Sequence, residues 1–86
     1  MAWRVEYSAA ALKALQRLDS PFRRRILSFV ETRVAVEPRR IGEALKGRLG
    51  EYWKYRVGSY RLICNIEDST CTVLVLHIGD RKEVYR

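Results

Sequence analysis

The clearest alternation of apolar and polar side chains lies in EYWKYRVGSYRLICNI, residues 51–66. Gly58 and Ser59 interrupt it, and glycine at the first central position of a two-residue loop favours a type II′ turn. The pattern therefore predicts a β-hairpin with this turn at its tip. Because side chains alternate between the two faces of a strand, one face of the hairpin is apolar and is expected to join the core. That face carries Trp53, Tyr55, Val57, Tyr60, Leu62, Cys64 and Ile66.

The opposite face of the hairpin gathers positive charge. A two-residue turn places Arg56 directly opposite Arg61, and Lys54 lies one step away on the same face. Like charges that face each other destabilise a strand pair, so this cluster opposes folding. A bound anion, and a phosphate above all, is the readiest reason for such a cluster. An ordinary solvated sheet face is the alternative interpretation of the same side chains.

The start of the chain predicts a short strand followed by a helix. Residues 2–7 alternate apolar or aromatic side chains with charged ones, as a strand does. Ser8 suits a helix N-cap, because its hydroxyl accepts a hydrogen bond from a free amide of the first turn. The following AAALKALQRL is expected to be helical. Its buried stripe is expected to carry Leu12, Leu15 and Leu18.

A second helix is predicted directly after the first. Ser20 as N-cap with Pro21 at the first helical position is a strong start signal, and Pro38 predicts the end. The link between the helices is short, so they are expected to form a two-helix hairpin. The buried face of the second helix is expected to carry Phe22, Ile26, Phe29, Val30 and Val34.

The second half of the chain adds the remaining strands. Residues 39–50 are expected to form a basic connector with a short turn at 41–45. The continuous apolar run 70–78 predicts a strand central in the sheet, broken by Gly79-Asp80, and 83–85 are expected to add a last short pairing. The order β-α-α-β-β-β predicts an α+β fold. In it, an N-terminal strand and a two-helix hairpin pack on a mainly antiparallel twisted sheet within one domain, 1–86.

Composition narrows the class of protein. Of 86 residues, 48% are hydrophobic, which is enough for a core, and no apolar run approaches the roughly 20 residues of a membrane span. Cys64 and Cys71 have neither metal-site spacing nor a disulfide pattern, so we expect a reduced, cytoplasmic protein without a metal or cofactor. The net charge is +7, from 17 Lys and Arg against 10 Asp and Glu. Nucleic acid or an acidic protein is therefore the expected partner, and not a membrane.

Three stretches give the chain a resemblance to a known family. The connector and hairpin, EALKGRLGEYWKYRVGSYRLI, the ending HIGDRKEVY and the two-helix start resemble the RelE/ParE superfamily of bacterial toxins from toxin–antitoxin pairs. The resemblance covers nearly the whole chain, and KYRVGSYRLI is its most specific part. The superfamily contains ribosome-dependent mRNA endonucleases, the RelE-like branch, and non-nuclease inhibitors of DNA gyrase, the ParE-like branch.

The residues favour the RelE-like branch. Its motif implies catalytic roles for Lys54, Arg61, Arg81 and Tyr85, at positions that match one by one. Our hypothesis is that the two arginines clamp a phosphate, that the lysine is a base or electrostatic partner, and that the tyrosine stacks on a base or orients the nucleophile. Tyr52 stands where the best-studied members have a second lysine. Further RNA contacts are expected from Arg56, Tyr52, Arg23, Arg24, Lys46 and Arg48, although an arginine run on a helix is most often solvated.

The resemblance implies cleavage of mRNA in the ribosomal A site, by attack of a ribose 2′-OH on the adjacent phosphate. It implies four partners: a RelB-like antitoxin, the 30S A site with its rRNA, the mRNA, and operator DNA reached only through the antitoxin complex. A ParE-like gyrase inhibitor is the alternative, and a catalytically decayed binding module is a weaker one. His77, a lone histidine at the end of an apolar strand, is expected to have a structural or surface role.

Overall fold

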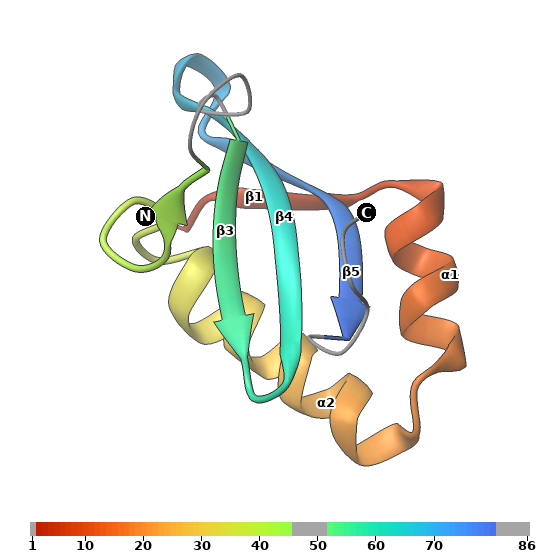
Figure 1. The fold of residues 1–86 in the computed structure, drawn as a ribbon. Coiled ribbons are helices and arrows are strands. Elements are labelled where there is room, and N and C mark those ends of the chain that lie inside the picture. The colour runs from red at the N-terminus through yellow and green to blue at the C-terminus, as the bar shows by residue number, and fades with distance from the viewer. Residues whose placement is uncertain (1, 46–51, 81–86) are drawn as a thin grey trace.

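The computed structural model describes residues 2–45 and 52–80. In this part of the chain two α-helices and a π-helical turn pack against a five-stranded sheet (Figure 1). None of the described helices has the length and apolar character needed to cross a membrane. The elements are β1 (Arg4–Tyr7), α1 (Ala9–Arg17), α2 (Ser20–Phe29), η1 (Val30–Val34), β2 (Glu43–Ala44), β3 (Tyr52–Val57), β4 (Tyr60–Glu67), η3 (Asp68–Thr70) and β5 (Thr72–Asp80).

The sheet has the strand order β1-β5-β4-β3-β2. Strand β1 pairs with β5 in parallel, and the other three pairs are antiparallel. Helix α1 lies along β5, while α2 and η1 pass behind β4 and β3 in Figure 1. The described helices thus cover one face of the sheet and leave the other face open. The predicted α+β fold, with helices on one side of a mainly antiparallel sheet, is confirmed.

The hairpin of β3 and β4 has the predicted turn and register. Gly58 has φ +60°, and Cys71 is the one described residue other than glycine with positive φ. Positive φ at the first central position alone is the signature of a type II′ turn. Arg56 pairs with Arg61 as predicted, and Lys54 pairs with Ile63. Local turn chemistry therefore sets which side chains share the open face.

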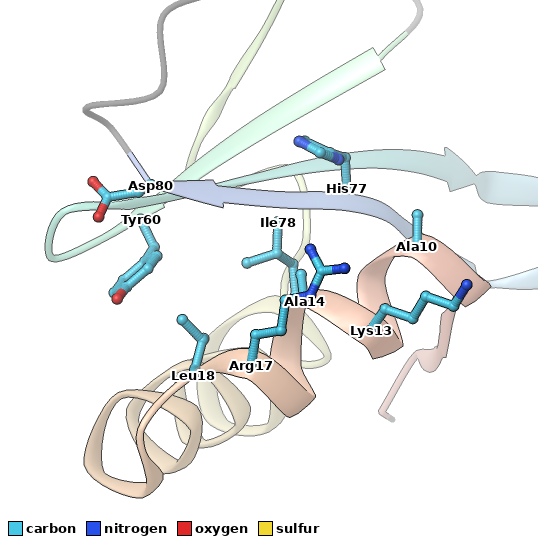
Figure 2. Close-up of a pocket in the computed structure, with 9 residues that line it drawn as sticks. All are labelled: Ala10, Lys13, Ala14, Arg17, Leu18, Tyr60, His77, Ile78 and Asp80. Atoms are coloured by element: carbon cyan, nitrogen blue, oxygen red, sulfur yellow. The ribbon is translucent and has the colours of Figure 1, made fainter.

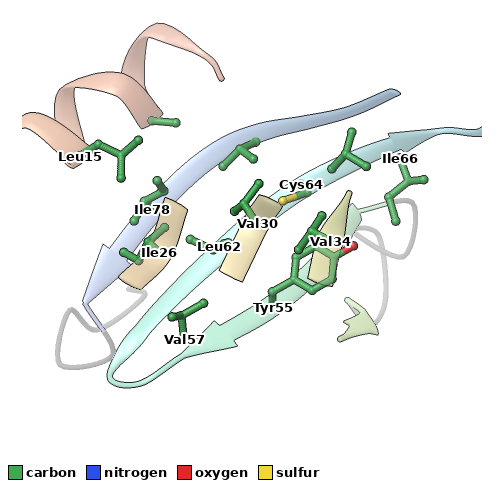
Figure 3. Close-up of a cluster of buried hydrophobic side chains, with 13 residues drawn as sticks. Leu15, Ile26, Val30, Val34, Tyr55, Val57, Leu62, Cys64, Ile66 and Ile78 are labelled. Carbon is green, nitrogen blue, oxygen red and sulfur yellow. The ribbon is translucent and has the colours of Figure 1, made fainter. Parts of the chain in front are cut away.

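The core lies between the helices and the covered face of the sheet (Figure 3). Helix α1 contributes Leu15 to it, but Leu12 is 48% exposed, so the predicted stripe is wrong at that position. Ala11 is fully buried in its place. A methyl side chain lets the helix backbone approach β5 closely, and this rotates the larger Leu12 out to solvent. The buried cluster comprises Ala11, Leu15, Ile26, Val30, Val34, Tyr55, Val57, Leu62, Cys64, Ile66, Val73, Val75 and Ile78.

The second helix differs from the prediction at both ends. Its N-cap is Asp19 and not Ser20, which is already helical. Its last turn widens into η1, closed by a hydrogen bond of 2.8 Å from the Ala35 amide to the Val30 carbonyl. Phe22 was expected in the core but is 43% exposed, and its ring packs on that of Tyr60 at a centroid distance of 5.7 Å. The first turn of α2 therefore lies at the rim of the core.

Three strand boundaries also differ. Strand β1 begins at Arg4 and not at residue 2, and the connector contains the two-residue strand β2 where a turn was expected. Strand β5 runs on through Gly79 to Asp80, where a break was predicted, because both residues pair with β4. It is an interior strand, but β4 is the central one. The pairing predicted for 83–85 lies outside the described residues.

Candidate functional site

The open face of the sheet is hollowed between its strands. The hollow has a volume of about 390 Å³. Its walls combine apolar side chains with two cations, an aromatic hydroxyl and an imidazole. The lining residues are Leu45, Tyr52, Lys54, Arg61, Ile63, Leu76 and His77. The structure therefore brings Tyr52, Lys54 and Arg61, all expected from the sequence, into one depression.

The strand register arranges this hollow in rows. Glu43 on β2 pairs with Lys54 on β3, which pairs with Ile63 on β4, which pairs with His77 on β5. Lys54 and His77 thus flank Ile63 on its two neighbouring strands. Arg61 lies two residues before Ile63 on the same face of β4. A lysine, an arginine and a histidine therefore surround one small patch of the sheet.

Lys54 forms an ion pair with a carboxylate on the neighbouring strand. Its Nζ lies 3.2 Å from Oε1 of Glu43, and its side chain is 19% exposed. The carboxylate reduces the mutual repulsion of the cationic face, which the hairpin alone would carry in full. It also fixes the ammonium at the wall of the hollow. This partner comes from β2, which the sequence pattern did not predict.

The connector that carries Glu43 is tied to the sheet by two side-chain hydrogen bonds. The Tyr55 hydroxyl donates to the Pro38 carbonyl at 2.5 Å, and the Trp53 indole Nε1 donates to the Ile41 carbonyl at 2.8 Å. Both donors lie on β3. These two bonds hold residues 38–41 in place, and β2 follows directly. The aromatic residues of the core face thereby position the carboxylate that meets Lys54.

A further ion pair ties the connector to the far end of the hairpin. Arg39 donates two hydrogen bonds to Asp68, at 3.1 and 2.6 Å, and its guanidinium lies 5.4 Å from the ring centroid of Trp53. The hydrogen bond from Arg39 lowers the pKa of the Asp68 carboxyl. The same bond raises the pKa of Arg39. The pair is exposed, so it orients the connector more than it stabilises the fold.

A β-bulge decides where His77 points. The pairing of β4 with β5 shifts between Ile63 and Cys64, so that Ile63 pairs with His77 and Cys64 with Val75. Leu76 is the extra residue. Without it, the alternation that buries Val75 would turn His77 towards the core as well. In the structure His77 is exposed.

Figure 2 shows the consequence for the two sides of β5. His77 points away from α1, and Ile78 points towards it. The view centres on a second hollow, of about 400 Å³, between α1 and the end of β5. The imidazole lies at the border of both hollows. His77 was expected to have a structural or surface role; the structure places it at the surface, beside Lys54 and Arg61.

The other predicted contacts are distributed differently. Arg56 is exposed on the open face, directly opposite Arg61. Arg24 is exposed on α2, in the helical layer on the other side of the sheet. Arg23 was expected to contact RNA, but its guanidinium donates to the carbonyls of Leu15 at 2.9 Å and Leu18 at 2.7 Å. Arg23 therefore closes the end of α1.

Four predicted residues lie outside the described part of the chain. Within residues 2–45 and 52–80, no group of three or more His, Cys, Asp or Glu side chains could hold a metal ion. The described hollow offers amine, guanidinium, phenol and imidazole groups. The four predicted residues outside it are Lys46, Arg48, Arg81 and Tyr85.

Comparison with known proteins supports the fold and identifies the family. A family model described as "ParE toxin of type II toxin-antitoxin system, parDE" matches residues 5–85. The chain belongs to this ParE toxin family. It is thus a toxin of a type II toxin–antitoxin system, and the resemblance to the RelE/ParE superfamily is confirmed.

Two curated toxins of Mycobacterium tuberculosis are similar to this ParE-family chain over most of their length. Toxin RelG is 29% identical over 86 residues, which cover 100% of this chain and 99% of RelG. Toxin RelE is 31% identical over 84 residues, which cover 98% of this chain and 87% of that toxin. The relatives of this family member are therefore RelE-like.

Solved structures match the same fold. A chain of the toxin–antitoxin complex RelBE2 from M. tuberculosis has a TM-score of 0.88 at 26% identity, covering 96% of this chain and 95% of that one. The isolated E. coli RelE toxin has a TM-score of 0.81 at 24% identity, covering 96% and 88%. At that identity the E. coli structure is evidence for the fold alone.

Proposed function

We propose that this toxin is a ribosome-dependent endoribonuclease that cleaves mRNA in the ribosomal A site. The observation that carries the proposal is the juxtaposition of Lys54 and Arg61 in one hollow of the open sheet face, beside Tyr52. The volume of about 390 Å³ falls within the range of pockets that hold small ligands. A nucleotide offers the phosphate that these cations match and the base that Tyr52 can stack on.

The reaction proposed is transfer of the phosphate to the neighbouring ribose oxygen. The 2′-oxygen forms a bond to phosphorus as the bond from phosphorus to the 5′-oxygen breaks, leaving a 2′,3′-cyclic phosphate and a 5′-hydroxyl. The proton of the 2′-OH leaves, and the 5′-oxygen gains one. Negative charge develops on the phosphate oxygens in between. Arg61, which lines the hollow, would stabilise that charge, and Arg81 would share this role by its match to the RelE-like motif.

The names of the relatives favour this branch over gyrase inhibition. The curated relatives are toxins RelG and RelE, although the matching family model has the ParE name. A gyrase inhibitor needs no phosphate clamp in a concave site. The open cationic face is therefore better explained by RNA cleavage. Because Tyr52 stands in place of a lysine, Lys54 is the one lysine that lines this hollow among the described residues.

We propose a RelB-like antitoxin as the partner that keeps the toxin inactive. Solved relatives include the RelBE2 complex of M. tuberculosis and the intact RelBE complex of E. coli. A chain with a net charge of +7 and an open cationic face suits an acidic antitoxin segment. The complex would reach operator DNA through the antitoxin, and the free toxin would meet the ribosome and its mRNA.

The test is primer extension on a reporter mRNA in a translating extract, with and without ribosomes. We expect new 5′ ends at A-site codons only with ribosomes. Arg61→Ala is expected to lower the cleavage rate about 10²–10³-fold, because it removes charge stabilisation at the phosphate. Arg4→Ala is the matched control, since Arg4 is a well-exposed arginine on β1, outside the hollow.

Two results would overturn the proposal. If Arg61→Ala retains ribosome-dependent cleavage at the wild-type rate, the hollow takes no part in the reaction. Absence of cleavage by wild type, together with growth arrest in cells and loss of supercoiling activity of purified gyrase, would establish the ParE-like alternative instead.

A further inference from the structure

We propose that His77 is the general base of the cleavage reaction, and that Lys54 is the general acid. This assignment rests on the proposed function, and it concerns a residue outside the four catalytic positions matched above. It reverses the role expected for Lys54 from the sequence. The β-bulge at Leu76 is the structural feature that brings the imidazole to the open face.

The positions of the two side chains suit an in-line displacement. Lys54 and His77 occupy the same cross-strand row, separated by Ile63, with Arg61 beside that row on the central strand. Neighbouring strands lie about 4.8 Å apart, so the two backbones are about 10 Å apart. A phosphate held by Arg61 over Ile63 would have one proton-transfer group on each side. In an in-line reaction the attacking and leaving oxygens also lie on opposite sides of phosphorus.

The chemistry of the lining groups assigns the direction of proton transfer. Arg61 is a guanidinium, which has no acceptor and does not deprotonate in proteins. Lys54 lies 3.2 Å from the Glu43 carboxylate, and an ammonium so paired has hydrogens to donate but no lone pair to accept one. A neutral imidazole has one acceptor nitrogen, and histidine is the side chain most often used as a general base.

The proton balance is then complete. The imidazole of His77 takes the proton of the 2′-OH as the 2′-oxygen bonds to phosphorus. Lys54 gives a proton to the 5′-oxygen as its bond to phosphorus breaks. Afterwards the imidazolium releases its proton to water, and the lysine amine regains one. No metal, oxidant or further reactant is needed for this cycle.

The decisive experiment uses two mRNAs on programmed ribosomes, identical except at the cleaved linkage. One has the natural 5′-oxygen, and the other has sulfur in its place, a leaving group that needs no proton. Single-turnover cleavage is measured for wild type, His77→Gln, His77→Asn and Lys54→Ala. Lys13→Ala is the control, because Lys13 is an exposed cation on the α1 side of His77.

We expect His77→Gln and His77→Asn to slow cleavage about 10²–10⁴-fold on both mRNAs, as loss of a general base does. Lys54→Ala should slow cleavage of the oxygen linkage and recover most of that loss on the sulfur linkage. Because His77 is exposed, both of its variants should unfold at the wild-type temperature.

Each other outcome is distinguishable. Wild-type rates in both His77 variants would refute the role of His77 while leaving the proposed endonuclease intact. Recovery of the His77 variants on the sulfur linkage would make His77 the acid and overturn the assignment. Absence of cleavage of either mRNA by wild type would refute the proposed function itself.

Discussion

Replacing Tyr55 by phenylalanine tests how the connector is held in place. Tyr55 is 1% exposed, and its hydroxyl donates to the carbonyl of Pro38, which is itself buried. Tyr55→Phe keeps the ring and its edge contact with Phe29, at a centroid distance of 6.2 Å. What it removes is one hydrogen bond, so that a buried carbonyl loses its donor.

The magnitude follows from the burial of that carbonyl. Leaving a buried polar group without its partner costs about 1–3 kcal/mol, more than the net value of an exposed hydrogen bond. For a domain of 60–100 residues, a loss of about 2 kcal/mol lowers the melting temperature by roughly 8–16 °C. The assays are urea unfolding at constant temperature and thermal unfolding followed by circular dichroism. Tyr52→Phe makes the same chemical change on the same strand at a half-buried position and should stay within about 0.5 kcal/mol of wild type.

The result also bears on the hollow, because the same connector leads to Glu43. If Tyr55→Phe unfolds within about 0.5 kcal/mol of wild type, the carbonyl of Pro38 is satisfied in another way, and the proposed anchoring is wrong. If the loss is as large as expected, the variant should also weaken the ion pair of Glu43 with Lys54. The NMR chemical shifts of the Lys54 side chain would then differ between the variant and wild type.

Three further predictions concern the turn of the connector, the cationic face and the core. Gly42→Ala should cost about 1–3 kcal/mol in urea unfolding, because Gly42 has φ +73° and an added Cβ would collide with the backbone of β3. Arg56→Gln should raise the free energy of unfolding by about 0.2–1 kcal/mol, because it removes one of two like charges directly opposite each other on β3 and β4. That gain should vanish in 1 M NaCl, where the screening length is about 3 Å, and an unchanged gain there would refute an electrostatic origin. At pH 8 a thiol reagent should modify the exposed Cys71 and leave Cys64 untouched until the protein unfolds, because burial raises the pKa of the Cys64 thiol from 9.0 to about 12. At a pH between 9.0 and about 12, the unfolded chain releases the Cys64 proton more readily than the folded chain does. The free energy of unfolding should therefore fall as the pH rises through this range, and it should fall less steeply in Cys64→Ala.

The hairpin was predictable because its determinants are local. A two-residue turn with Gly58 at its first position sets the register, and the register then assigns every side chain of β3 and β4 to a face. The juxtaposition of Arg56 and Arg61 follows from the turn alone. The same holds for Ser8, whose hydroxyl accepts from the Ala11 amide at 3.0 Å, as expected for an N-cap.

Strand β2 was not predictable because its determinants are distant in sequence. It is two residues long, too short for any periodicity to appear. Its position depends on hydrogen bonds that Trp53 and Tyr55 donate to carbonyls 12 and 17 residues earlier. No local sequence pattern predicts which carbonyl will accept a hydrogen bond from an indole or a phenol. The carboxylate partner of Lys54 was therefore missing from the sequence-based site.

Helix α1 shows a related limit. Helical periodicity allowed a stripe through Leu12, but the sheet selects a neighbouring stripe through Ala11 and Leu15. The choice depends on how closely the helix backbone can approach β5. Small residues such as alanine permit a close approach. Which stripe of the helix is buried therefore depends on how its side chains fit those of the sheet in the folded protein. The existence of the helix was thus predictable, and its rotation was not.

The position of His77 follows from a conflict that the sequence contains but does not resolve. Regular alternation from Val73 and Val75 would bury His77 and expose Ile78. Burying an imidazole without a partner is costly, and exposing isoleucine forfeits apolar burial, so both residues favour a shift by one. The bulge at Leu76 supplies that shift: Ile78 is 4% exposed, and His77 faces the open hollow. A β-bulge is therefore indicated where a polar residue occupies a strand position that alternation would bury and a large apolar residue follows it. Here that bulge adds an imidazole to the cationic face of the sheet.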